Sequence, residues 1–242
     1  MDRVVGLGYL ISFALGEQAS CPPVAVIHQI CGGAKRASTG DCLVCVSQSE
    51  FAGCTTDFKE LFCTSNNRMT RVWLNSTDHR HGVKAIDGSP ALYYIARNTS
   101  STKWVVWLQG GGICQSTADC QSLSKTDLGS SKGYNSKPQM NVLHPMVQGD
   151  IVVNPDFASW NRVYIPYVSG DFWNGQRMTP DKPSNPFDTD APSWSGYFQG
   201  HSILAETIYR LKRSENLGES TDAILTGCSA GGIGTIINCG EF

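Results

Sequence analysis

The pentapeptide Gly227-Cys228-Ser229-Ala230-Gly231 has the Gly-x-Ser-x-Gly spacing of a nucleophile elbow. In such a turn a serine connects a strand to a helix, and its hydroxyl is exposed for attack on a carbonyl carbon. Glycines flank the serine because side chains there would collide across so tight a turn. The helix that follows directs its N-terminal amides toward the developing negative charge. We therefore predict that Ser229 is the nucleophile of a hydrolase. A plain glycine-rich turn between strand and helix is the alternative.

A second glycine-rich segment, Gly110-Gly111-Gly112, follows the apolar run 104–108. Backbone N–H groups of a loop at the end of a hydrolase strand can bind a carbonyl oxygen, and with the amide of Ala230 they would form an oxyanion hole. A phosphate-binding loop is disfavoured, because no Gly-Lys-Ser/Thr follows and no Gly-x-Gly-x-x-Gly is present. A turn without a function stays open as the third interpretation.

Apolar patterning around the two motifs predicts an α/β fold with a mostly parallel sheet. The run 104–108 suits a strand buried on both faces, and residues 223–226 predict a strand directly before the elbow. Helices are predicted at 198–213, where the apolar residues share one face, and at 233–238. The other strands expected are 71–74, 91–96, 151–153 and 163–167, while 121–149 and 169–196 are expected to be loops.

The N-terminal quarter of the chain has a different composition. In residues 1–20, Arg3 precedes an apolar run, which is typical of a secretory signal peptide; a buried N-terminal element is the alternative. Six of the ten cysteines fall within residues 21–65, which predicts a disulfide-stapled module in an oxidising compartment. The Cys42-x-x-Cys45 spacing raises a zinc site as a second reading, but no further pair at similar spacing accompanies it.

Other features bear on localisation and partners. The sequons at Asn75 and Asn98 are candidate glycosylation sites and fit a secretory route. The formal net charge of −2, without a basic stripe, argues against a nucleic-acid partner. The N-terminal apolar run is too short to span a bilayer, so we expect no stable membrane insertion. Serine hydrolysis requires no cofactor, and we expect neither a metal nor an organic group.

Three segments resemble the pectin acetylesterase family, which includes the Notum carboxylesterases, and they occur in the family's order. They are 104–114 (WVVWLQGGGIC), 154–175 (NPDFASWNRVYIPYVSGDFWNG) and 227–242 (GCSAGGIGTIINCGEF). The resemblance covers residues 70–242 and leaves the Cys-rich residues outside. It implies an α/β-hydrolase with a Ser-Asp-His triad, in which Ser229 is the nucleophile and Gly111, Gly112 and Ala230 supply the oxyanion-hole amides.

The resemblance carries two further implications. The family often has a large side chain where Gly112 stands, so the width of the pocket is left open. Cys114 and Cys120 match a spacing that the family closes as a local disulfide.

In the matched segment 154–175, Asp156 and Asp171 are expected to have structural hydrogen-bonding roles. Its tryptophans Trp160 and Trp173 are expected to be packing anchors rather than part of a substrate cleft.

The acid and the base of the triad are missing from their expected place. In α/β-hydrolases the chain order is Ser, Asp, His, yet neither Asp nor His follows Ser229. All the histidines precede it, and none is expected to be catalytic: His28, His79, His81, His144 and His201. The prediction is a C-terminally truncated hydrolase domain that is inactive by itself. A natural short form and a triad with an upstream histidine are the alternatives.

The sequence therefore predicts a signal peptide (1–20), a Cys-rich module (21–65) and the N-terminal part of an α/β-hydrolase domain (70–242). The expected function is that of a secreted serine carboxylesterase. It would remove O-acetyl groups from an extracellular, pectin-like polysaccharide through an acyl-enzyme on Ser229. One alternative is removal of a longer acyl group from a protein or lipid, as in the Notum branch. A non-catalytic secreted binding protein is the other.

Overall fold

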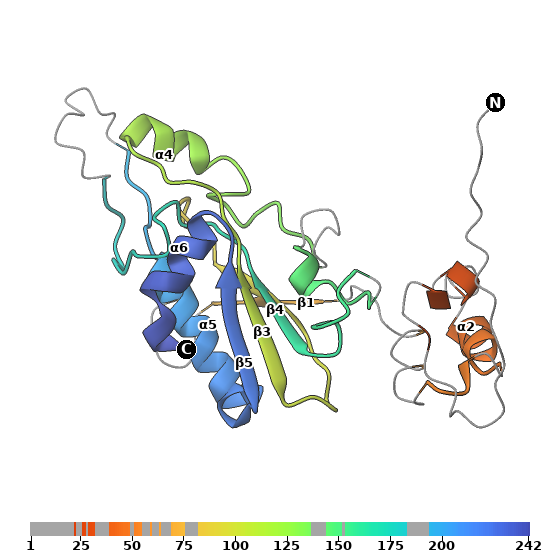
Figure 1. Cartoon of the computed structure of the whole chain (residues 1–242). Coiled ribbons are helices and arrows are strands. Elements are labelled where there is room, and N and C mark those ends of the chain that lie inside the picture. The colour runs from red at the N-terminus through yellow and green to blue at the C-terminus, as the bar shows by residue number, and fades with distance from the viewer. Residues whose placement is uncertain are drawn as a thin grey trace, which may run out of the picture. The chain divides into compact units, whose positions relative to one another are not determined.

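The computed structural model describes residues 22, 26–27, 29–31, 39–48, 51–54, 59, 63, 69–75, 82–136, 144–151, 153–182 and 194–242. The chain divides into two units, residues 1–64 and 65–242 (Figure 1). The expected signal peptide lies outside the described residues, as do His28, His79 and His81. Among the described helices, none is long and apolar enough to cross a bilayer.

Disulfides hold the N-terminal unit together. Its helix α2 (Thr39–Val46) carries Cys42, which bonds to Cys63, and Cys45, which bonds to Cys31. Because these two cysteines belong to different disulfides, the alternative of a zinc site at Cys42-x-x-Cys45 is wrong. Among the described residues of this unit, the buried apolar side chains other than cysteines are Ile27, Val46 and Phe51. Covalent staples stabilise small units of this kind.

The second unit is built on a five-stranded mixed sheet with the order β1-β2-β4-β3-β5. The strands are β1 (Thr70–Trp73), β2 (Leu92–Ala96), β3 (Lys103–Leu108), β4 (Asn161–Ile165) and β5 (Asp222–Gly227). Strands β4, β3 and β5 are parallel, whereas β1 and β2 join antiparallel. Leu108 pairs with both Ile165 and Gly227, so the three parallel strands end level with one another. The loops that follow them therefore meet at one edge of the sheet.

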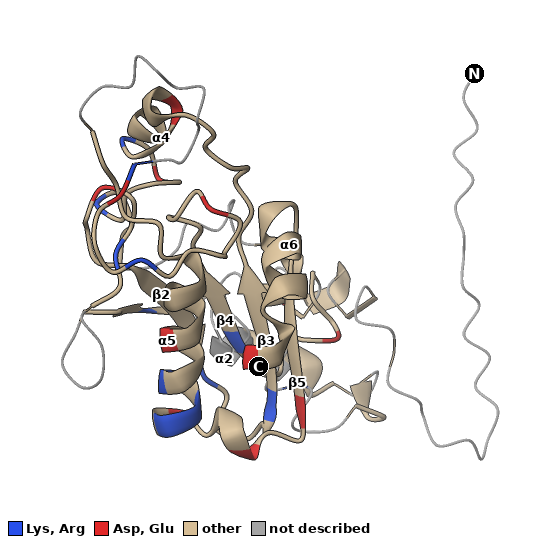
Figure 2. Cartoon of the chain, turned by 90° about the vertical axis from the view of Figure 1, so that its left-hand side faces the viewer, with Lys and Arg blue, Asp and Glu red and all other residues tan. Residues whose placement is uncertain are grey.

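Helices cover one face of this sheet. The face consists of alternate side chains such as Val106 and Val163, and it packs against α5 (Gly200–Ser214) through Ile203, Ile208 and their apolar neighbours. The helix α6 (Ala230–Ile237) follows β5 directly and lies beside α5 in both views (Figures 1 and 2). The opposite face buries another set of side chains: Leu92, Tyr94, Trp107, Tyr164 and Val147. The burial of both faces agrees with the continuous apolar runs of the parallel strands.

Two expectations about secondary structure need correction, one about a strand and one about a loop. The predicted strand 151–153 is wrong, because Ile151 and Val153 lie in turns. The amides of Val153 and Asn154 both donate to the Asp150 carbonyl, which folds the chain back and leaves Val153 48% exposed. The segment 121–149, expected to be a loop, contains the end of a helix, α4 (Thr117–Leu123), and a 3₁₀ turn (Pro145–Val147). α4 has no apolar periodicity; a cap and a disulfide define it instead.

Candidate active site

Ser229 stands between β5 and α6 in a strained backbone conformation. Its φ of 57° and ψ of −126° lie outside the regions that L-residues ordinarily occupy, as in a nucleophile elbow. The side chain is exposed. The Gly231 amide donates to the Cys228 carbonyl at 2.9 Å and closes the tight turn. The turn therefore presents a serine hydroxyl at the carboxyl edge of the sheet.

The glycines of the elbow are required by contacts with β3. A Cβ on Gly231 would overlap the carbonyl oxygen of Leu108 and lie 2.8 Å from the Leu108 carbonyl carbon. A Cβ on Gly227 would lie 2.7 Å from the same oxygen. Both contacts are with backbone, which cannot move away as a flexible side chain would. The elbow is thus seated directly on the end of β3.

The triple-glycine loop after β3 contacts this elbow. A Cβ on Gly110 would overlap the Cys228 carbonyl oxygen and lie 3.0 Å from Ser229 Cβ and 3.4 Å from the Ala230 amide nitrogen. Within the part of the chain that is described, the amides of Gly111, Gly112 and Ala230 have no hydrogen-bond acceptor. Gly112 has a φ of 77°, and a Cβ there would meet nothing within 4 Å. Unpaired donors beside an accessible serine are what an oxyanion hole requires.

Two residues that the sequence analysis did not single out hold the glycine loop in place. Gln109 Oε1 accepts a 2.9 Å bond from the Tyr167 amide, and the Gln109 carbonyl accepts one from Trp173 Nε1. The Tyr167 hydroxyl donates to the Gly112 carbonyl and accepts from the Phe172 amide, both at 2.8 Å. A polar residue between an apolar strand and three glycines was the one available signal for Gln109. Its partners, more than 50 residues away, could not be identified from sequence.

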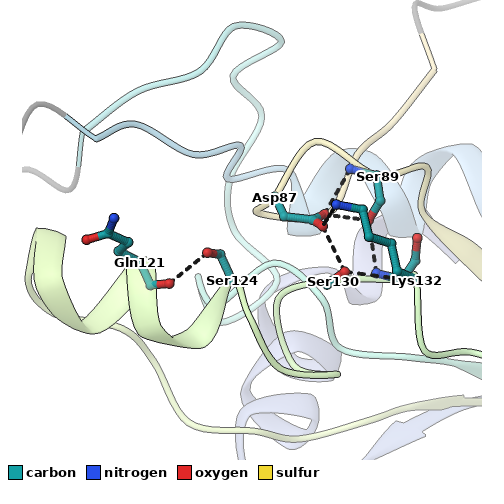
Figure 3. Close-up of polar contacts among 7 residues, drawn as sticks. Asp87, Ser89, Gln121, Ser124, Ser130 and Lys132 are labelled. Carbon is teal, nitrogen blue, oxygen red and sulfur yellow. Dashed lines mark hydrogen bonds and ion pairs between the residues drawn. The ribbon is translucent and has the colours of Figure 1, made fainter.

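On its other side the glycine loop approaches Leu128, because a Cβ on Gly111 would lie 2.8 Å from that side chain. A polar network holds the chain just after Leu128. Figure 3 shows the Asp87 carboxylate facing Ser89, Ser130 and Lys132. It accepts bonds from the Ser89 amide at 2.9 Å, the Ser89 hydroxyl and the Ser130 hydroxyl at 2.8 Å, and Lys132 Nζ lies 3.0 Å away. Burial alone would raise the pKa of Asp87, but these donors outweigh it and the pKa lies below its ordinary value.

This lowered pKa makes Asp87 a source of acid sensitivity. Ionised Asp87 contributes stability above the pKa of the unfolded state, about 4, and the contribution is lost as pH falls through the lower folded-state pKa. We expect Asp87→Asn to reduce the free energy of unfolding at pH 7 by about 1–2 kcal/mol and to flatten the fall in stability below about pH 4. Urea denaturation between pH 3 and pH 7 measures both effects. Glu219→Gln, an exposed control, should change neither; equal acid sensitivity in Asp87→Asn and the native chain would contradict the prediction.

Asp171 and Trp173 organise the loop after β4. The Asp171 carboxylate accepts bonds from Ser169 Oγ at 2.6 Å and from the amides of Gly200 at 2.8 Å, Gly175 at 3.1 Å and Trp173 at 3.1 Å. Burial raises the pKa of Asp171, and these hydrogen bonds oppose the shift. Trp173 is fully buried, at a φ of 64°, against Gly234 of α6. Both residues have structural contacts of the kind that we expected.

The described histidines do not lie beside Ser229 as a base would. Asn238 Nδ2 donates to the carbonyls of Trp173 and Gly234, which identifies Oδ1 as the oxygen of the Asn238 amide. Because this oxygen can only accept, His201 Nδ1 donates to it at 2.6 Å. Asn238 follows the last residue of α6, and eight helical residues span about 12 Å from the Ser229 end. His144 stacks on Trp107 with ring centroids 3.7 Å apart, and burial lowers its pKa. Neither has a hydrogen bond to Ser229.

The remaining candidate residues are a cysteine pair and the two sequon asparagines. Cys114 and Cys120 form a disulfide at the start of α4, and the Cys114 amide donates to the Gly170 carbonyl. Asn75 is exposed. Asn98 is half-buried, and its Nδ2 donates to the Ser159 carbonyl at 2.6 Å. A glycan on Asn98 would leave this nitrogen a single N–H to keep that bond.

Comparison with known proteins identifies the family. Residues 63–242 match the family model described as Pectinacetylesterase, which is more than half of the chain. The chain belongs to the pectinacetylesterase family. Pectin acetylesterase 4 of Arabidopsis thaliana is 31% identical to this pectinacetylesterase-family chain over 209 residues, covering 85% of it and 47% of the plant protein. The palmitoleoyl-protein carboxylesterase NOTUM of Schmidtea mediterranea is 32% identical over 168 residues, covering 68% and 28%.

A solved structure confirms the fold class. The Wnt deacylase Notum from Drosophila superimposes with a TM-score of 0.59 at 27% identity, over 73% of this chain and 46% of that one. The sheet and its helices are therefore those of a Notum-like α/β-hydrolase. The chain spans less than half the length of each of these three relatives.

Proposed function

We propose that this chain supplies the nucleophile and the oxyanion hole of a secreted serine carboxylesterase. The observation that carries the proposal is the exposed Ser229 at a φ of 57°, beside a glycine loop whose amides lack acceptors in the described structure. The Ser229 oxygen would add to the ester carbonyl carbon and form a tetrahedral intermediate. The amides of Gly111, Gly112 and Ala230 would stabilise its oxyanion, each by about 3 kcal/mol. Departure of the alcohol leaves the acyl-enzyme, which water then hydrolyses.

The proposed substrate is an O-acetyl group on an extracellular polysaccharide. The plant relative named as a pectin acetylesterase matches 85% of the chain, more than the NOTUM relative does. A longer acyl group on a protein is the second candidate. It is favoured by the structural match to a Wnt deacylase and by the open space at Gly112, where a Cβ would meet no described atom within 4 Å.

The acid and the base of the triad are proposed to come from a segment outside these 242 residues. Helix α6 supports this proposal, because it has no charged residue (Figure 2) and leaves Ile233, Ile236 and Ile237 exposed by 41%, 75% and 48%. A helix that is apolar on all sides is normally covered by protein. Among the described strands, β5 pairs only with β3, so its other edge is free for a further strand.

Labelling with a fluorophosphonate probe tests the nucleophile. The protein is expressed with the further segment that we propose to carry the acid and the base, and separately as these 242 residues. We expect the longer protein to be labelled, Ser229→Ala to abolish the labelling, and the shorter chain to show neither labelling nor turnover of p-nitrophenyl acetate. Ser214→Ala, which removes an exposed hydroxyl from the end of α5, is the matched control. Labelling that survives in Ser229→Ala would disprove the assignment, and so would a folded longer protein that the probe never labels.

A further inference from the structure

The amides that would form the oxyanion hole belong to two peptide planes that no hydrogen bond holds. These planes join residues 110–111 and 111–112 and carry the amides of Gly111 and Gly112. Among the described residues, neither their amides nor their carbonyls have a hydrogen-bond partner. Glycine loses more conformational freedom on ordering than any other residue. A loop of three glycines therefore needs fixed ends if its amides are to be pre-organised for an oxyanion.

Two aromatic side chains hold the peptide planes on either side. Trp173 Nε1 donates to the Gln109 carbonyl at 3.2 Å, which fixes the plane at the start of the glycine loop. The Tyr167 hydroxyl donates to the Gly112 carbonyl at 2.8 Å, which fixes the plane at the end of the loop. The two planes with the oxyanion-hole amides are thus suspended between two fixed ones.

Tyr167 contacts the glycine loop along its whole length. Its amide donates to Gln109 Oε1 at 2.9 Å, just before the first glycine. Its ring lies against the middle of the loop, since a Cβ on Gly111 would lie 2.7 Å from Tyr167 Cδ1. Its hydroxyl bonds to the carbonyl of the last glycine, Gly112. The side chain is fully buried, and its ring centroid lies 5.5 Å from that of Trp173. One immobile side chain therefore supports all three parts of the loop.

The hydrogen of the Tyr167 hydroxyl is directed at the loop by a second bond. The hydroxyl oxygen accepts from the Phe172 amide at 2.8 Å, and a phenol has a single hydrogen to donate. That hydrogen goes to the Gly112 carbonyl. Burial raises the pKa of Tyr167 above its ordinary value, so the hydroxyl remains a donor through the neutral and mildly alkaline range.

We propose that Tyr167 is a positioning residue of the oxyanion hole, which keeps the amides of Gly111 and Gly112 in their catalytic orientation before a substrate binds. The inference rests on the proposed function, since it concerns acyl transfer at Ser229. Tyr167 is buried and touches no substrate, so it acts only through the peptide planes of the loop. An oxyanion hole binds the transition state more strongly than the ground-state carbonyl. Loss of the Tyr167 hydroxyl should therefore slow the chemical step and leave substrate binding unchanged.

Steady-state kinetics of Tyr167→Phe in the longer protein measures this role. The substitution keeps the ring and removes only the hydroxyl. Because a misplacement of about 1 Å costs about 100-fold in rate, we expect kcat for p-nitrophenyl acetate to fall about tenfold or more. KM should change by less than about twofold. Tyr164→Phe is the matched control, since Tyr164 is equally buried and its hydroxyl has no hydrogen-bond partner among the described residues. It should change neither constant.

Nitrogen relaxation of isotope-labelled glycine amides, measured by NMR in the longer protein carrying Ser229→Ala, tests the positioning without turnover. We expect order parameters of about 0.85 for Gly111 and Gly112 when Tyr167 is present, and below about 0.6 in Tyr167→Phe. Gln109→Leu removes the acceptor of the Tyr167 amide at similar side-chain size, and it should loosen the loop as well. This second variant keeps the test decisive if Tyr167→Phe does not fold.

The outcomes separate this inference from the proposed function. Unchanged glycine order parameters, an unchanged kcat or a change confined to KM in Tyr167→Phe would overturn the positioning role while leaving the probe labelling of Ser229 intact. An equal loss of rate in Tyr164→Phe would also overturn it, since removal of any buried hydroxyl would then suffice. Loosening of the loop in a protein whose Ser229 no probe labels would keep the contact between Tyr167 and the loop and reject the esterase.

Discussion

Replacing Gly231 with alanine should slow ester hydrolysis by about 100-fold and destabilise the second unit. The new Cβ would overlap the Leu108 carbonyl oxygen and approach the Gln109 carbonyl carbon to 3.0 Å. These are backbone atoms at the end of β3, so the elbow itself must move. Displacement of the nucleophile by about 1 Å costs about 100-fold in rate, and overpacking costs about 1–3 kcal/mol of stability. The rate of fluorophosphonate labelling in the longer protein and urea denaturation measure the two losses.

The neighbouring glycine provides the matched control. Gly232 is on the same helix, but its nearest contact for a Cβ is the Gly227 carbonyl oxygen at 3.4 Å, an ordinary van der Waals distance. Alanine favours helix over glycine by about 1 kcal/mol, so Gly232→Ala should be neutral or slightly stabilising and should keep its labelling. Similar behaviour of the two variants would mean that the elbow does not rest on β3 as described.

The elbow was predictable because its signals are local. The pattern Gly-x-Ser-x-Gly, an apolar strand before it and a helix-compatible run after it lie within about 16 residues. The register that ends β3, β4 and β5 level with one another then brings Gly110 to Ser229, as expected for parallel strands. Local patterning sufficed here because steric requirements at a tight turn restrict the residue types strongly.

The rest of the site depends on contacts between distant residues. Gln109 binds Tyr167 and Trp173, 58 and 64 residues later, and no period or motif encodes such a pair. Helix α4 was missed for a related reason: its sequence TADCQSL has no apolar stripe, and the Ser116 cap and the Cys114–Cys120 disulfide define it. The run 151–153 was misread as a strand because an apolar triplet was given more weight than the turn formed around Asp150.

Replacing Asp171 with alanine should be the most destabilising substitution in the loop after β4. Its carboxylate satisfies the amides of Trp173, Gly175 and Gly200, and Gly200 is the first residue of α5. Without it these donors lose their acceptor, while Trp173 must still keep its φ of 64°. Because each unsatisfied donor costs about 1–3 kcal/mol and water can replace part of the loss, we expect a loss of about 3–5 kcal/mol.

Asp156→Ala is the control for this prediction, because Asp156 lies in the same sequence segment and is exposed. It has no hydrogen bond or ion pair with another described residue, so the structural hydrogen-bonding role that we expected for Asp156 is not found. The substitution should change the free energy of unfolding by less than about 0.5 kcal/mol. Urea denaturation followed by tryptophan fluorescence reports on both variants, since Trp173 is buried between Tyr167 and α6. Equal midpoints for the two variants would show that the four-donor network does not hold the loop. In that case the packing of Trp173 against Gly234 would have to position the α5 end and the elbow helix by itself.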